Sequence, residues 1–134
     1  MPMIPEAVIA MLACGRIGAI HSVVFGGFAS NELASRIDDS KAKILITASC
    51  GFEPGRTVEY RPLVDGALKL AKHKVERVIF FQRKAHEVKL NSPLEINWEE
   101  ALVNAKIKIV LRLEQMSSHI FCIPQALQVF QRVL

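Results

Sequence analysis

An arginine at the end of a short rigid turn is the first feature of this sequence that could do chemistry. In GFEPGR, residues 51–56, Pro54 fixes one backbone angle and Gly55 accepts a positive one, which is typical of a tight turn. Arg56 would then project from a backbone with little freedom. A guanidinium offers a planar fork of donors that grips a phosphate or stacks on a flat base. Arg56 is therefore either an anion-binding side chain or an ordinary surface arginine in a turn.

A pair of glycines, Gly26 and Gly27, is the second candidate. It follows the strand-like run at 20–25 and precedes a helix-like run, which is where doubly wound folds bind ligands. The pair lacks the third glycine of a dinucleotide fingerprint and the lysine of a P-loop. The alternative is that the glycines only let the chain turn tightly and the next helix pack close.

Other catalytic and metal-binding patterns are missing from the sequence. The four histidines show no metal spacing, and Gly-x-Ser-x-Gly and His-Glu-x-x-His do not occur. Cys14, Cys50 and Cys122 are far apart and form neither a zinc motif nor a disulfide framework, which fits a reducing compartment. His21 lies in an apolar strand, so we expect a core histidine. The sequence thus predicts no catalytic residue and no metal site.

Helices and strands alternate along the chain. We expect helices over 5–18, 30–39, 61–74 and 97–106, and strands over 20–25, 42–48 and 76–81. Gly18 would end the first helix, Ser30 would cap the second, and Asn97 would cap the last. The first helix is apolar almost all round, which predicts burial on most sides. This order predicts an α/β fold with a parallel sheet covered on both faces, and three strands are few for such a sheet.

Composition narrows the classes of partner. The net charge is +4, but the lysines and arginines are scattered, so no nucleic-acid partner is predicted. No apolar run approaches about 18 residues, so no membrane span is predicted. The start of the chain has neither a cationic secretory n-region nor an arginine-rich presequence, and no targeting segment is predicted.

Long runs of the sequence resemble a known enzyme family. MPMIPEAVIAMLACGRIGAIHSVVFGGF, and EPGR followed by VEYRPLV, are similar to the short-chain acyl-CoA synthetases of the acetyl- and propionyl-CoA synthetase kind, with the propionyl-type branch closer. These belong to the adenylate-forming superfamily. A weaker resemblance through VERVIFFQR and INWEEAL reaches about residue 106. The resemblance implies an incomplete part of a doubly wound, mainly parallel sheet from the large N-terminal domain of an adenylate-forming enzyme.

The resemblance also implies a chemistry. The family condenses a short carboxylate with ATP, in the presence of Mg, to an acyl-adenylate and transfers the acyl group to coenzyme A. It implies that the 3′-phosphate-ADP end of coenzyme A is contacted by Glu53, Pro54, Gly55 and Arg56, and that Gly26 and Gly27 lie beside the pantetheine path. Acetyl-type members carry a basic residue where Glu53 stands. Propionyl-type relatives are typically mitochondrial (matrix) in animals, which is the only ground for that location here.

Several family motifs do not occur in these 134 residues. They are the phosphate loop with its lysine, the carboxylate pocket with its tryptophan, the adenine motif and the catalytic lysine. We therefore expect sites for ATP and Mg to be absent and the chain alone to be inactive as a ligase. Residues 1–106 are predicted to be a partial acyl-CoA synthetase domain. Residues 107–134 are predicted to be a divergent tail, as in a truncated isoform or a gene-model artefact.

A second interpretation belongs to another class of protein. The chain could be a non-catalytic interaction module or an aggregation-prone truncated product. Exposed sheet edges and the alternating run IKIVLRL would then favour pairing with another chain or self-association.

Overall fold

The computed structural model describes residues 1–24, 29–105 and 128–132. The helices are α1 (Pro5–Ile17), α2 (Ser30–Ser40), α3 (Arg61–Leu70) and α4 (Trp98–Val103). The strands are β1 (Ala19–Val23), β2 (Ile44–Ala48), β3 (Cys50–Glu53), β4 (Arg56–Glu59), β5 (Arg77–Phe81), β6 (Glu95–Asn97) and β7 (Gln128–Arg132). The predicted alternation of helices and strands is therefore confirmed through β5, except that β3 and β4 stand between β2 and α3.

Five strands form the main sheet in the order β1-β7-β2-β5-β6. The pairs β2/β5 and β5/β6 are parallel, whereas β7 is antiparallel to both β1 and β2. Four of these strands thus run in one direction, which confirms a mainly parallel α/β fold. β7 and β6 were not predicted, and β7 falls inside the predicted tail. The strand-like run 107–113 lies outside the described residues.

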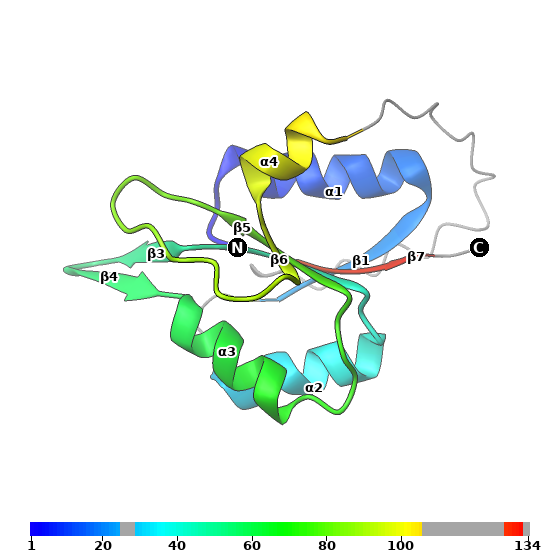
Figure 1. The fold of residues 1–134 in the computed structure, drawn as a ribbon, viewed down its shortest axis with the longest axis horizontal. Coiled ribbons are helices and arrows are strands. Elements are labelled where there is room, and N and C mark those ends of the chain that lie inside the picture. Colours follow the sequence, from blue (N-terminus) through cyan, green and yellow to red (C-terminus); the bar gives the residue numbers. More distant parts are fainter. Residues whose placement is uncertain (25–28, 106–127, 133–134) are drawn as a thin grey trace.

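Helices cover both faces of the sheet. α1 and α4 lie on one face, and α2 and α3 lie on the other (Figure 1). Between α2, α3 and the sheet, the core is built around the fully buried Ile37, Leu45 and Phe80. On the α1 side, Trp98 meets Phe81 edge-on, with ring centroids 6.3 Å apart. Each face of the sheet therefore has its own apolar cluster, as a doubly covered sheet requires.

The ends of α1 are as predicted, but its burial is not. Pro5 begins the helix, and Gly18 ends it in the left-handed conformation at φ 68°. Val8, Ile9 and Leu12 are 47%, 53% and 65% exposed. The prediction of burial on most sides is wrong for this helix, because only one stripe of it reaches the sheet.

Two predicted helix caps have different outcomes. Asn97 caps α4, since its side chain accepts a hydrogen bond from the Glu99 N–H at 3.4 Å. Ser30 does not cap α2, because the cap position is Ala29 and Ser30 already lies in the first turn. The cap of α4 was therefore predicted correctly, whereas α2 begins one residue earlier than a Ser30 cap would place it.

α3 ends earlier than the predicted residue 74. The backbone becomes extended at Ala71, whose carbonyl accepts a hydrogen bond from the Lys74 ammonium at 3.1 Å. The His73 N–H donates to Asp38 on α2 at 2.7 Å instead of continuing the helix. This bond holds the pKa of Asp38 below its ordinary value. The segment that follows α3 is therefore held against the neighbouring helix α2.

Candidate functional site

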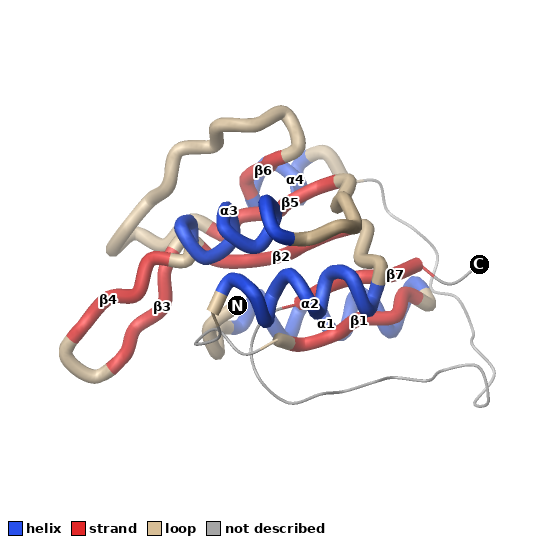
Figure 2. Tube along the Cα trace, turned by 90° about the horizontal axis from the view of Figure 1, so that it is seen from below, coloured by secondary structure: helices blue, strands red, loops and turns tan. Residues whose placement is uncertain are grey.

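The segment GFEPGR forms a β-hairpin that projects from the body of the protein (Figures 1 and 2). β3 and β4 pair antiparallel in a sheet of their own, with Glu53 opposite Arg56. Pro54 and Gly55 form the two-residue connection, and Gly55 has φ 78°. The predicted tight turn is confirmed, but strands rather than irregular loop flank it.

Arg56 lies at the end of this hairpin and is open to solvent. Its side chain is 69% exposed. The Nε and Nη2 groups both donate to Oε2 of Glu53, at 2.8 and 2.6 Å. The guanidinium is thus held across the hairpin by a carboxylate of the same turn and is not drawn into the core.

Ser49 anchors the base of the hairpin to the main sheet. It is fully buried, its N–H donates to the Phe81 carbonyl at 2.9 Å, and its carbonyl accepts from the Tyr60 N–H at 3.1 Å. The Ser49 hydroxyl also accepts from the Arg83 N–H at 2.9 Å. The hairpin is therefore fixed to the carboxyl end of β2 and β5, the edge of a parallel sheet where α/β proteins bind ligands.

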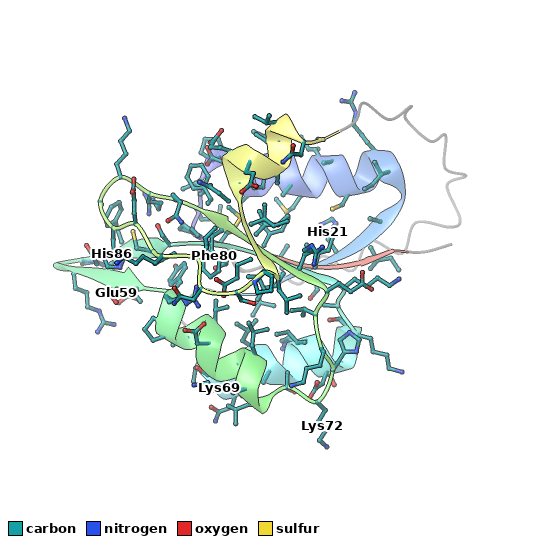
Figure 3. The ribbon with its side chains drawn as sticks, viewed as in Figure 1. His21, Glu59, Lys69, Lys72, Phe80 and His86 are labelled. Atoms are coloured by element: carbon teal, nitrogen blue, oxygen red, sulfur yellow. The ribbon has the colours of Figure 1, made fainter. Side chains whose placement is uncertain are left out.

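A turn at residues 83–86 packs on one face of the hairpin. The Arg83 guanidinium carbon lies 4.1 Å from the centre of the Phe52 ring, which is cation–π distance. His86 Nε2 lies 3.8 Å from Glu59 Oε1, and these two residues sit together near the base of the hairpin (Figure 3). Sequence reasoning missed Arg83 and Phe52, because their spacing along the chain carries no signal of contact.

The opposite face of the hairpin carries the candidate residues. Alternation along the strands places Gly51, Glu53, Arg56 and Val58 on this face. A side chain at Gly51 would collide with the Tyr60 hydroxyl, so Tyr60 covers the base of the same face. Burial raises the pKa of Tyr60, and the negative charge of Glu53 raises it further. The face can therefore present one fork of cationic donors next to one carboxylate.

The other predicted site residues are the glycine pair that follows β1. Gly26 and Gly27 lie outside the described residues.

His21 is buried as predicted, and its burial lowers the pKa of the imidazole. Within the described ranges, no three His, Cys, Asp or Glu side chains gather as a metal site would require. Among those same residues, no helix has the length and apolar character to cross a bilayer.

Comparison with known proteins finds relatives with similar names. The chain is 54% identical over 107 residues to "Acyl-CoA synthetase short-chain family member 3, mitochondrial" of Rattus norvegicus, covering 79% of this chain and 16% of the relative. The protein of the same name from Homo sapiens is 53% identical over 107 residues, with the same shares covered. "Acetyl-coenzyme A synthetase" of Vibrio vulnificus (strain YJ016) is 44% identical over 119 residues, covering 88% of this chain and 18% of the relative.

These relatives are much longer than the matched segment. The chain spans about a sixth of their length. The family model described as AMP-binding enzyme matches residues 1–116, which is most of the chain. Its sequence is thus similar to the short-chain acyl-CoA synthetases, and the chain belongs to the AMP-binding enzyme family.

Proposed function

We propose that this chain is part of an AMP-forming ligase that joins a short fatty acid, propionate or acetate, to coenzyme A. Relatives named as a short-chain acyl-CoA synthetase and as an acetyl-coenzyme A synthetase support the joining of a short acyl group to coenzyme A. Propionate is proposed from the sequence resemblance alone. In this proposal the chain supplies part of the coenzyme A surface, and its described residues make no contact with ATP or Mg. The mitochondrial matrix is the proposed location, since two of the relatives are named mitochondrial.

The exposed guanidinium of Arg56 is the observation that carries the proposal. An arginine can bind a phosphate through two parallel hydrogen bonds when a ligand can reach its guanidinium from solvent and when its backbone is held in place. Arg56 has both, because its side chain is 69% exposed and its turn is fixed by Pro54 and by Gly55 at φ 78°. The residues present therefore fit the 3′-phosphate of coenzyme A.

The remaining residues of the proposed site have smaller roles. Glu53, Pro54 and Gly55 shape the turn and offer backbone groups to the 3′-phosphate-ADP end of the ligand. Gly26 and Gly27, which lie outside the described residues, are proposed to border the pantetheine chain, where the lack of a side chain lets a ligand approach the backbone. Residues 107–134 are still proposed as a tail of divergent sequence, and residues 128–132 of that tail supply β7.

Calorimetric titration with coenzyme A and dephospho-coenzyme A tests the proposal. The two ligands differ only by the 3′-phosphate. We expect Arg56→Gln to weaken coenzyme A binding about tenfold or more, the scale of a hydrogen bond to a charged group, and to leave dephospho-coenzyme A unchanged. Arg77→Gln is the matched control. Arg77 is also exposed, but it begins β5 and so lies at the amino end of the parallel strands, opposite the end that carries the hairpin. Equal affinities of Arg56→Gln and wild type for coenzyme A would refute the proposal.

A self-associating interaction module is the second candidate, and exposed apolar side chains favour it. Met3, Ile9 and Leu12 on or next to α1, and Leu102 and Val103 on α4, are each more than half exposed. α1 and α4 lie on the same face of the sheet (Figure 1), and contiguous apolar patches mark interaction surfaces. If a second copy covers them, light scattering after size exclusion should show a dimer that Leu12→Lys dissociates and Arg56→Gln leaves intact. A monomer at all concentrations would remove this candidate.

A further inference from the structure

We propose that Glu53 competes with phosphate for the Arg56 guanidinium and thereby sets the charge that a ligand needs in order to bind the hairpin. The inference rests on the proposed function, in which Arg56 receives a phosphate. It assigns Glu53 a role in specificity: this carboxylate disfavours ligands that carry a single negative charge.

The geometry of the pair shows what the ligand has to replace. Both Nε and Nη2 of Arg56 donate to the same oxygen of Glu53, Oε2, at 2.8 and 2.6 Å. These two donors form one edge of the guanidinium, the edge that binds a carboxylate or a phosphate through parallel hydrogen bonds. Glu53 therefore occupies the position in which a bound phosphate oxygen would accept the same bonds.

The pair is arranged in advance by the fold of the hairpin. Glu53 and Arg56 are direct cross-strand partners on either side of the Pro54-Gly55 turn. They lie on one face, while Arg83 is engaged on the other face by the Phe52 ring and by the Cys50 carbonyl at 3.4 Å. Arg83 therefore does not share the contact with Glu53, and Arg56 can leave Glu53 without any change in how the hairpin is anchored.

Charge decides which ligands can displace Glu53. A carboxylate carries one negative charge, and so does a phosphodiester. A phosphomonoester such as the 3′-phosphate of coenzyme A carries about −1.5 to −2 at neutral pH. Only the monoester offers Arg56 a stronger partner than the one it already has. Breaking the bonds between Arg56 and Glu53 costs the same whichever anion arrives, so this cost takes a larger share of what a monoanion gains than of what a dianion gains.

The exchange is feasible because both side chains face solvent. Arg56 is 69% exposed and Glu53 is 42% exposed. An exposed ion pair is weak, so breaking it reduces ligand affinity by only about two- to fivefold. Removal of the competing carboxylate should therefore raise the affinity for coenzyme A by about the same factor.

The test is a titration of four proteins with coenzyme A and dephospho-coenzyme A: wild type, Glu53→Gln, Arg56→Gln and the double variant. We expect Glu53→Gln to bind coenzyme A about two- to fivefold more tightly than wild type, and the double variant to lose this gain. Glu59→Gln is the matched control. It removes one negative charge from the same hairpin, on the face that does not carry Arg56, and should change the affinity less than Glu53→Gln does.

A second arm uses inorganic phosphate as the probe and does not depend on coenzyme A. The Arg56 Nε–H resonance is followed by NMR as phosphate is added. It should shift at lower phosphate concentration in Glu53→Gln than in wild type, whereas Glu59→Gln should resemble wild type.

The outcomes separate the two proposals. If Arg56→Gln weakens coenzyme A binding but Glu53→Gln gives no gain, the role of Glu53 is wrong and the proposed function stands. A gain that persists in the double variant, or that Glu59→Gln matches, also overturns the role of Glu53. If coenzyme A does not distinguish Arg56→Gln from wild type, the proposed function fails, and the phosphate arm still decides whether Glu53 competes for Arg56.

Discussion

Arg61 and Glu95 join the first turn of α3 to the first residue of β6. Arg61 Nη1 donates to Glu95 Oε2 at 2.9 Å, and their side chains are only 17% and 5% exposed. Arg61 Nε also donates to Asp65 Oδ2 at 2.9 Å, and the guanidinium carbon lies 5.5 Å from the centre of the Phe80 ring. Glu95 accepts a further bond from the Asn91 N–H at 2.7 Å. This ion pair connects the helix layer to the edge strand of the sheet.

Replacing Glu95 by glutamine should destabilise the fold. The change removes the more buried of the two carboxylates that Arg61 faces and leaves Asp65 as the other, while the guanidinium stays largely buried. We expect the free energy of unfolding to fall by about 1.5–3 kcal/mol, the contribution of hydrogen bonds to a charged group. Urea denaturation followed by circular dichroism measures this. Glu76→Gln is the control, because Glu76 pairs with Lys43 at 3.9 Å with both side chains more than half exposed, and it should cost less than about 1 kcal/mol. Equal losses of unfolding free energy in Glu95→Gln and Glu76→Gln would contradict a stabilising role for the buried ion pair.

The same carboxylate predicts a dependence of stability on pH. Burial by itself raises the pKa of Glu95, but the hydrogen bonds from Arg61 and the Asn91 N–H outweigh it, so the pKa lies below its ordinary value of 4.5. Between these two values the unfolded chain binds more protons than the folded one. The contribution of Glu95 is therefore complete above pH 4.5 and is lost as the pH falls through the lower, folded value.

Denaturation of wild type and Glu95→Gln as a function of pH checks this prediction. The difference in free energy of unfolding between the two proteins should be largest near neutral pH and should shrink as the pH is lowered below 4.5. A difference that grows as the solution is acidified would show that folding raises the pKa of Glu95 and does not lower it.

Two glycine substitutions should change stability in opposite directions. Gly55→Ala places a side chain at φ 78°, a conformation that costs an ordinary residue about 1–2 kcal/mol. Gly15→Ala lies inside α1, where an added methyl group meets nothing within 4 Å. It should stabilise the protein by about 0.5–1 kcal/mol, because alanine favours helix. Melting temperatures of the two variants beside wild type measure both effects. The prediction fails if both variants move in the same direction.

Cys14 should react with alkylating reagents only when the protein unfolds. Cys14 is a free thiol on α1 with 5% of its surface exposed, and burial raises its pKa to about 12. The thiolate is the reactive species, so modification with iodoacetamide at pH 8 should be at least about a hundredfold slower in the folded chain than in denaturant. Mass spectrometry of the Cys14 peptide measures both rates. Similar rates would place this thiol at the surface.

Much of the local structure could be predicted from short stretches of sequence. The turn at Pro54 and Gly55, the limits of α1 at Pro5 and Gly18, and the Asn97 cap of α4 were all readable. Each depends on backbone angles or on hydrogen bonds between residues within one turn of each other. The exposed position of Arg56 follows from the same local rule, because a two-residue turn leaves the flanking side chains at the end of a hairpin.

Contacts between distant segments could not be predicted in this way. The cation–π contact of Arg83 with Phe52 anchors the hairpin, and neither residue was singled out from its spacing. The exposed side chains of α1 show the same limit, since an apolar helix indicates what can be buried but not what is present to cover it.

The sequence alone determined that the chain alternates helices and strands and places an arginine after a rigid turn, because those properties depend on neighbouring residues. Only the tertiary structure decided that β7 inserts between β1 and β2, that Glu95 meets Arg61, and that Arg83 supports the hairpin. The physical reason is that these contacts are set by packing and hydrogen bonding between segments that meet only after the chain has folded.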